Sequence, residues 1–226
     1  MAETITITSG HDGFEFTALH ADPQGARKGG VIVIQEIFGL DRYVHEDVAR
    51  WAALGFEALA PSMFDRQEVG FTAEHDPEGM QSGVKYAMAN GPDNAMSDIQ
   101  ACIDHLAPRG PVFIVGYCYG GTMVWLAASR TTGLSAGSSY YGGQVAGMAS
   151  LPLSCPVQVH LGRKDAHIPA DEVKAKVTEA HPEVAVFIYE KAGHGFNNDG
   201  RPDSDLDDAK LARRRTLELF EANGAA

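Results

Sequence analysis

Two short runs of apolar, mostly β-branched residues constrain this sequence more than any other feature. They occupy residues 31–34 (VIVI) and 112–115 (VFIV). An uninterrupted apolar run of this length is typical of a strand that is covered on both faces, as in a parallel sheet. Both runs are far shorter than the roughly 20 apolar residues that a membrane-spanning helix needs. The sequence therefore predicts a buried parallel sheet and no membrane span.

Strand patterns alternate with helical patterns along most of the chain. We expect further strands over 56–60, 136–141, 157–161 and 184–189, and helices over 43–54, 93–106, 122–129, 170–180 and 205–221. This alternation indicates an α/β fold, in which helices cover both faces of a mainly parallel sheet. Residues 62–80 are rich in turn formers and are expected to be irregular.

The beginning of the chain has a different pattern. Residues 4–8 and 14–18 alternate polar and apolar side chains, and Asp12-Gly13 between them is a turn signal. This pattern predicts an N-terminal antiparallel hairpin. No repeat, low-complexity tract or linker interrupts the sequence, so we expect one domain over residues 1–226.

The charge balance excludes several classes of partner. The net charge is −12 at pH 7, whereas nucleic-acid proteins need a basic face to neutralise phosphates. Attraction to an anionic membrane surface is excluded for the same reason. The N-terminus lacks the basic and apolar regions of a signal peptide. The three cysteines, Cys102, Cys118 and Cys155, form neither a disulfide framework nor a CxxC pair. We expect a cytoplasmic protein.

Cys118 lies in the most informative local motif. The segment Gly116-Tyr117-Cys118-Tyr119-Gly120 follows an expected strand and precedes an expected helix. This is the context of the G-x-S-x-G nucleophile elbow, with cysteine in place of serine. The two glycines leave room for a sharp turn, and the helix dipole favours a thiolate at its start. For Cys102 and Cys155 a buried, inert thiol is the better interpretation.

An elbow nucleophile needs an acid and then a histidine later in the chain. Asp165 follows the strand expected over 157–161, and His194 follows the strand expected over 184–189. Side chains at the carboxyl ends of parallel strands meet at one edge of the sheet. Taken singly, Asp165 could cap the helix near residue 169, and His194 could be an ordinary loop histidine. With the elbow, they predict a Cys–Asp–His triad.

No metal or cofactor is expected. The sequence has no HExxH motif, and His160 and His167 stand on opposite sides of Asp165 without a further ligand pattern. We interpret the histidines other than His194 as surface residues or as core residues with satisfied hydrogen bonds.

Four segments together resemble the dienelactone hydrolase family. They are residues 33–39 (VIQEIFG), 116–121 (GYCYGG), 162–165 (GRKD) and 192–196 (AGHGF), and the resemblance extends over roughly residues 5–220. It implies a single-domain α/β-hydrolase fold that opens dienelactone to maleylacetate without metal or cofactor. It also implies Cys118 as nucleophile, His194 as base and Asp165 as the residue that orients the base.

The resemblance further implies an oxyanion hole made by the backbone N–H groups of Ile37 and Tyr119. The motif supports this assignment, since one donor follows the nucleophile and the other follows an early strand. Glu36 matches a family glutamate that contacts the resting thiol and shifts when substrate binds, which would protect the thiol from oxidation. Its other interpretation is a buried acid paired with an arginine.

The chain departs from the family where the substrate carboxylate binds. Two family arginines are missing, one in the segment around Lys85 and one at the position of Asn198. Lys85, Arg66 or Arg201 are possible substitutes, although an ammonium lacks the bidentate geometry of a guanidinium. Tyr86 and Tyr141 match pocket aromatics of the family, or they simply pack beside strand ends.

Three other functions fit parts of the sequence. A general carboxylesterase or thioesterase would use the same triad on a less anionic substrate. A glutamine amidotransferase would pair its base as His-x-Glu, whereas His194 is followed by Gly195 and Phe196. A non-catalytic small-molecule binder would not need an intact triad. We expect a small lactone or ester substrate, and a monomer or weak homo-oligomer.

Overall fold

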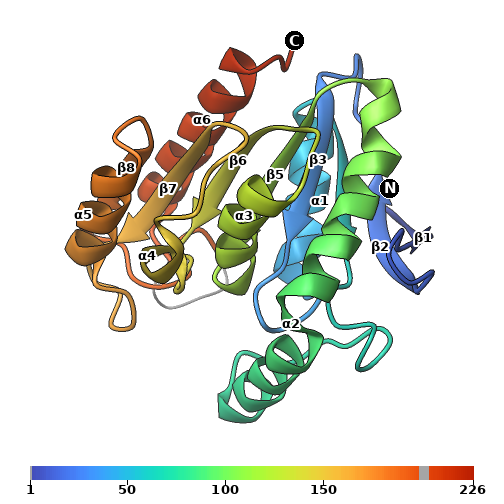
Figure 1. Ribbon diagram of the computed structural model, residues 1–226, viewed down its shortest axis with the longest axis horizontal. Helices are drawn as coiled ribbons and strands as arrows, with labels where there is room; N and C mark the ends of the chain where they lie inside the picture. Colours follow the sequence, from blue (N-terminus) through green and yellow to red (C-terminus); the bar gives the residue numbers. More distant parts are fainter. Residues whose placement is uncertain (1, 199–203) are drawn as a thin grey trace.

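The computed structural model describes residues 2–198 and 204–226, and it contains one eight-stranded sheet (Figure 1). The strands are β1 (Glu3–Thr8), β2 (Glu15–Ala21), β3 (Gly29–Ile34), β4 (Phe56–Pro61), β5 (Val112–Tyr117), β6 (Leu134–Tyr140), β7 (Val157–Gly162) and β8 (Ala185–Tyr189). Their order in the sheet is β1-β2-β4-β3-β5-β6-β7-β8. Strands β3 to β8 run parallel, and β2 pairs antiparallel with both β1 and β4. The predicted parallel sheet and N-terminal hairpin are confirmed.

Helices cover both faces of this sheet, as expected. They are α1 (Arg42–Ala53), α2 (Pro77–Leu106), α3 (Tyr119–Arg130), α4 (Val145–Met148), α5 (Ala170–Ala180) and α6 (Leu206–Ala222), with a short 3-10 helix, η1, at Ala107–Arg109. Helices α1 and α6 lie on one face, where the rings of Trp51 and Phe220 are 5.6 Å apart. Helices α2, α3 and α4 lie on the other face (Figure 1).

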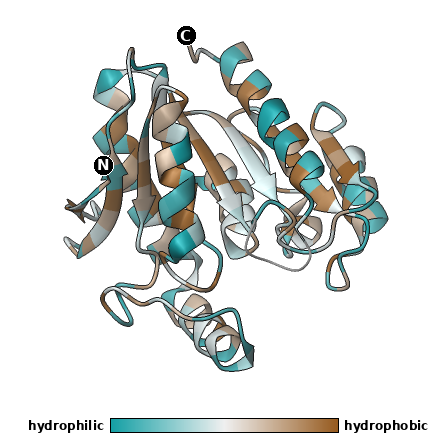
Figure 2. Ribbon diagram, turned by 180° about the vertical axis from the view of Figure 1, so that it is seen from behind, coloured by the Kyte–Doolittle hydropathy of each residue, from teal (hydrophilic) through white to brown (hydrophobic). Residues whose placement is uncertain are grey.

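Apolar side chains fill the space between the helices and the sheet. Residues of β3 and β5 are almost completely buried along their whole length, in agreement with strands covered on both faces. Figure 2 shows the hydrophobic colour concentrated on these strands and the hydrophilic colour on the outer faces of the helices. None of the helices in the described part of the chain has the length and apolar character needed to cross a membrane.

Helix α2 corrects the sequence prediction. The helix was expected to begin at residue 93, whereas it begins at Pro77, inside the segment that was expected to be irregular. The Asp76 carboxylate caps the helix by accepting a hydrogen bond from the Gly79 N–H at 2.8 Å. Gly91, with φ of 68°, interrupts the helix. The outer half escaped prediction because its apolar residues do not face the core; those most exposed are Met80, Val84 and Met88.

Candidate active site

Cys118 lies at the junction of β5 and α3, at the carboxyl edge of the sheet. Its backbone has φ of 53°, a left-handed conformation that is uncommon for residues other than glycine. The flanking glycines make this turn possible. A Cβ on Gly116 would lie 2.3 Å from the Gly120 carbonyl oxygen, and one on Gly120 would lie 2.3 Å from the Ile34 carbonyl oxygen. The sequence motif is therefore a true elbow.

The three thiols have different environments. Cys102 is completely buried, and burial raises its pKa well above the usual value. Burial also raises the pKa of Cys155, to about 11. Cys118 is partly exposed and lies beside the His194 imidazole, whose pKa it acts to raise. Because a thiolate is the reactive form of cysteine, Cys118 has the environment expected of a nucleophile, while Cys102 and Cys155 stay protonated near neutral pH.

Asp165 and His194 meet as the sequence predicts. Asp165 follows β7, His194 follows β8, and Oδ2 of Asp165 is 2.7 Å from Nδ1 of His194. The other carboxylate oxygen of Asp165 accepts the N–H groups of His167, at 2.9 Å, and Ile168, at 3.1 Å. Asp165 therefore organises its own loop with one oxygen and orients the imidazole with the other. Helix α5 begins at Ala170, and its N-cap residue is Pro169 with no side-chain cap hydrogen bond, so Asp165 does not cap it.

The charge balance around His194 favours the imidazolium. Burial by itself would lower the pKa of His194, but the hydrogen bonds and charges of Asp165 and Cys118 outweigh it and raise this pKa to about 10. For Asp165, burial acts to raise the pKa, and the His194 partner and two backbone N–H groups lower it below the usual value. Asp165 therefore stabilises the protonated form of His194, the form that arises when the imidazole accepts a proton.

The loop after β3 contains the predicted oxyanion donor Ile37 and the predicted gating acid Glu36. This loop is close to the elbow, because the Gly120 N–H donates to the Gln35 carbonyl at 3.1 Å. Glu36 is 4% exposed. Tyr119 is the first residue of α3, so its N–H is one of those that a helix leaves without an intrahelical partner. The loop and the elbow thus bring both predicted oxyanion residues to the same region.

The predicted substrate contacts fall into two groups. Tyr141 and Asn198 are buried near His194, and the Tyr141 ring centroid is 4.8 Å from that of His194. Tyr86 and Lys85 belong to the outer half of α2. Lys85 is exposed, with Nζ 5.7 Å from the centroid of the Tyr86 ring.

Of the two arginines considered as substitutes for the family arginines, the structure describes Arg66 but not Arg201. Arg66 binds the Asp98 carboxylate through two nitrogens, at 3.0 and 2.7 Å, and it also pairs with Asp12 at 2.6 Å. Its guanidinium is therefore already engaged by two carboxylates. Arg201 lies outside the described residues, as does part of the acidic stretch before α6.

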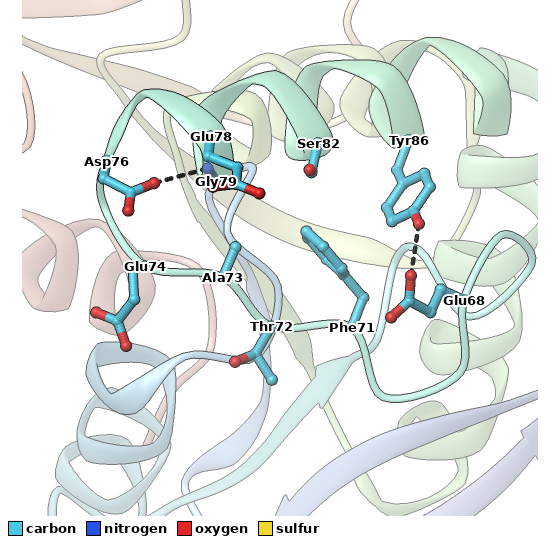
Figure 3. Close-up of a pocket in the computed structure, with 10 residues that line it drawn as sticks. All are labelled: Glu68, Phe71, Thr72, Ala73, Glu74, Asp76, Glu78, Gly79, Ser82 and Tyr86. Atoms are coloured by element: carbon cyan, nitrogen blue, oxygen red, sulfur yellow. Dashed lines mark hydrogen bonds between the residues drawn. The ribbon is translucent and has the colours of Figure 1, made fainter.

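A groove of about 370 Å³ separates the outer half of α2 from the segment that precedes it (Figure 3). Figure 3 shows Glu68 reaching the Tyr86 hydroxyl across the groove. None of the described residues that line the groove is a lysine or an arginine; its four acids are Glu68, Glu74, Asp76 and Glu78. The wall of the groove is tied to the loop after β3, because the Ala73 N–H donates to the Phe38 carbonyl at 3.0 Å.

Among the described residues, no group of three or more His, Cys, Asp or Glu side chains could hold a metal ion. His160 is completely buried and hydrogen-bonds to the hydroxyls of Tyr189 and Ser138. Burial lowers its pKa to about 3. It is therefore a neutral core histidine with satisfied hydrogen bonds, as interpreted from the sequence.

Sequence reasoning missed Asn197 and Tyr43. Asn197 accepts a hydrogen bond from the Tyr141 hydroxyl and donates one to the Tyr43 hydroxyl. Tyr43 belongs to α1, so this contact joins residues 154 positions apart. The position of Asn197, three residues after His194, was the only local signal.

The elbow, the acid–histidine pair and the strand order define an α/β hydrolase. The family model of the dienelactone hydrolase family matches residues 16–224, so the chain belongs to this family. The carboxymethylenebutenolidase of Pseudomonas putida is 29% identical over 230 residues, which cover 97% of this chain and 96% of that protein. The same values hold for the carboxymethylenebutenolidase of Pseudomonas knackmussii.

A solved structure gives the same assignment. The crystal structure of a proposed dienelactone hydrolase from Klebsiella pneumoniae matches with a TM-score of 0.84 and 26% identity, covering 98% of this chain and 99% of that chain. Family and fold together make the protein a hydrolase of ester or lactone bonds. The predicted family and fold are confirmed.

Proposed function

We propose that the protein hydrolyses a lactone or ester through a thioester on Cys118. The observation that carries this proposal is the line of side chains at the carboxyl edge of the sheet: a partly exposed elbow thiol beside His194, which is held by Asp165 at 2.7 Å. A thiol, a base and an acid that fixes the base are the parts that nucleophilic acyl transfer requires.

In the first half-reaction, Sγ of Cys118 attacks the carbonyl carbon, and His194 holds the thiol proton. The carbonyl oxygen becomes an oxyanion that accepts the N–H groups of Ile37 and Tyr119. One such donor contributes about 3 kcal/mol to transition-state stability in other acyl-transfer enzymes. The C–O bond then breaks, and the leaving oxygen takes the proton from the imidazolium. A lactone keeps this leaving group tethered to the acyl-enzyme.

In the second half-reaction, water attacks the thioester carbon while His194 takes its proton. The second oxyanion collapses, the C–S bond breaks, and the sulfur recovers a proton from the imidazolium as the acid product leaves. A tethered enolate from a lactone could itself accept the water proton. Glu36, buried beside the elbow, is the gating acid of this proposal: it contacts the resting thiol and moves when substrate binds.

The substrate class has two candidates. Membership of the dienelactone hydrolase family and the carboxymethylenebutenolidase relatives favour ring opening of dienelactone to maleylacetate. A carboxylesterase or thioesterase with a less anionic substrate is favoured by the absence of arginine at the two family positions and by the engagement of Arg66 with Asp98 and Asp12. In the first case, Lys85, Tyr86, Tyr141 and Asn198 are the proposed substrate contacts.

The test is the loss of cis- and trans-dienelactone, followed by absorbance, compared with the hydrolysis of neutral aryl esters. We expect Cys118→Ala to abolish every activity, and Cys155→Ala to retain it because the Cys155 thiol is inert. Turnover by Cys118→Ala would overturn the nucleophile assignment. Rapid loss of dienelactone supports the lactonase, whereas cleavage of aryl esters alone supports the esterase.

A further inference from the structure

A buried chain of hydrogen bonds runs from helix α1 to the loop that carries His194. The Tyr141 hydroxyl donates to Oδ1 of Asn197, and Nδ2 of Asn197 donates to the Tyr43 hydroxyl. The Tyr43 ring packs edge-on against that of Tyr117 with centroids 5.4 Å apart, and the Tyr117 hydroxyl donates to the Asp47 carboxylate at 2.6 Å. Every member of this chain is 5% exposed or less. The catalytic mechanism proposed above uses none of these bonds directly.

The far end of the chain is firmly anchored. The Asp47 carboxylate in α1 also accepts hydrogen bonds from Nε1 of Trp51, at 3.0 Å, and from Nη2 of Arg213 in α6, at 3.3 Å. Tyr43 and Tyr117 are neutral, since burial raises the pKa of both hydroxyls well above the usual value. A neutral hydroxyl both donates and accepts, so Tyr43 can accept from Asn197 while Tyr117 donates to the Asp47 carboxylate.

The near end of the chain meets the catalytic histidine. The Tyr141 ring packs against His194 with a centroid distance of 4.8 Å, and the Tyr141 backbone has φ of 37°, a conformation that its surroundings must hold in place. Asn197 is three residues after His194. The Asn198 N–H donates to the Gly195 carbonyl at 3.0 Å, and this bond closes a tight turn that includes Asn197.

We propose that Asn197 is a positioning residue, which holds the His194 loop and the Tyr141 ring in a fixed position relative to helix α1. This inference rests on the proposed function, because it assigns Asn197 a role through His194. Asn197 is suited to this role because its amide uses an acceptor on one side and a donor on the other. Leucine offers neither group, and aspartate cannot donate to Tyr43 unless it is protonated.

The expected consequence is kinetic. A histidine displaced by a fraction of an ångström still permits substrate binding, but it slows proton transfer, and a misplacement of about 1 Å costs roughly 10²-fold in rate. Variants at Tyr43 and Asn197, which are not among the proposed substrate contacts, should therefore lower kcat and leave KM unchanged. A side chain that contacts substrate directly would instead change KM.

The decisive variant is Tyr43→Phe, because Tyr43 is buried in α1 and removal of its hydroxyl alters no atom next to His194. The matched control is Tyr189→Phe. The Tyr189 hydroxyl is equally buried and hydrogen-bonds to His160, and its ring is 5.0 Å from Phe196 in the same histidine loop. Both substitutions remove one buried hydroxyl, so their losses of stability should be similar.

We expect kcat to fall about tenfold in Tyr43→Phe and in Tyr141→Phe, with little change in Tyr189→Phe. The double variant Tyr43→Phe/Tyr141→Phe should be no worse than either single one, because both break the same chain. Equal kcat in Tyr43→Phe and the control would overturn the proposal, as would additive losses in the double variant. His194→Ala separates the two hypotheses: if it stays active, the proposed mechanism itself is wrong.

Discussion

The two edges of the sheet each hold a buried carboxylate, and the two differ in their partners. At the amino edge, Glu57 is 2% exposed and binds three side chains: Arg27 at 2.8 Å, Arg109 at 2.7 Å and His20 at 3.0 Å. At the carboxyl edge, Asp165 has one ionisable partner, His194, and two backbone N–H groups.

The two carboxylates differ in whether their partners can exchange a proton. Burial acts to raise the pKa of Glu57, and its hydrogen bonds with Arg27 and His20 outweigh this effect and lower it below the usual value. Arginine does not give up its proton in proteins, so this cluster keeps its charge. Histidine does exchange its proton, and His194 reaches a thiol. A carboxylate saturated by arginines fixes structure, whereas one paired with a single histidine can take part in proton transfer.

The largest expected effect is on activity at the carboxyl edge. Asp165→Asn should lower kcat by up to about 10⁴-fold, because the imidazole loses the partner that fixes its tautomer and stabilises its charged form. Ester hydrolysis measures this effect, and Glu57→Gln is the comparison at the amino edge. Similar losses in both variants would contradict the distinction between a catalytic and a structural carboxylate.

The second expected effect is on the free energy of unfolding. Here the variant at the amino edge, Glu57→Gln, should lose more than the variant at the carboxyl edge, Asp165→Asn. Glu57→Gln removes the counter-charge of Arg27, whose side chain is 17% exposed, and of Arg109, whose side chain is 46% exposed. The free energy of unfolding should fall by about 1.5–3 kcal/mol, the range for hydrogen bonds to charged groups. Asp165→Asn should cost less, because His194 can lose its proton and become neutral. Urea denaturation of both variants measures the difference. A larger loss in Asp165→Asn would refute this order.

A pH titration sharpens the comparison further. The pKa of His194 is raised from 6.5 to about 10, so its contribution to stability is complete below pH 6.5 and is lost as the pH rises through 10. The pKa of Asp165 is lowered from 3.8, so its contribution is complete above pH 3.8 and is lost as the pH falls through the folded value. Glu57 behaves like Asp165 in acid, but its arginine partners remain charged in alkali.

Unfolding free energies measured from pH 4 to pH 10 test this expectation. The stability gap between the unmodified protein and Asp165→Asn should shrink between pH 6.5 and pH 10. The gap for Glu57→Gln should stay constant over that range. An NMR titration should show a lower pKa for His194 in Asp165→Asn, since that substitution removes the hydrogen bond and charge that raise it. An unchanged pKa would contradict the assigned cause.

The smallest expected effect comes from an exposed cluster at the same carboxyl edge. Arg163 bonds to Glu190 at 3.1 Å and to Asp171 at 2.7 Å, but both acids are more than 70% exposed. Water screens such pairs, so Glu190→Gln should leave the melting temperature and kcat unchanged. A measurable loss of either would show that the edge itself, and not burial, determines the importance of a charge.

The sequence was sufficient for those parts of the site that depend on local geometry. The elbow is readable because only glycine fits at residues 116 and 120, where a Cβ would collide with backbone carbonyls. Asp165 and His194 are readable because each follows a strand, and parallel strands bring their carboxyl ends to one edge. The strands were predicted nearly to their ends, and the central ones, such as β3, β4, β5 and β7, are apolar runs buried along their whole length.

The parts that the sequence did not indicate depend on distant or outward-facing residues. The outer half of α2 has no core-facing apolar pattern, and Met88 there is 79% exposed. The hydrogen bond between Asn197 and Tyr43 and the cluster around Glu57 join residues far apart in the chain. A polar side chain in a sequence does not reveal which distant partner will satisfy it. Tertiary packing decided these contacts.

The late position of β8 in the chain, at one border of the sheet, has a consequence for folding during synthesis. Translation, at about 5–20 residues per second, delivers Cys118 several seconds before the strand that leads to His194. Until β8 has formed, Cys118 lacks the imidazole of His194, whereas Asp165 already follows β7. If Cys118 and His194 act as proposed, a chain that ends before β8 should not hydrolyse esters. The return of ester hydrolysis during refolding should then report the formation of this strand.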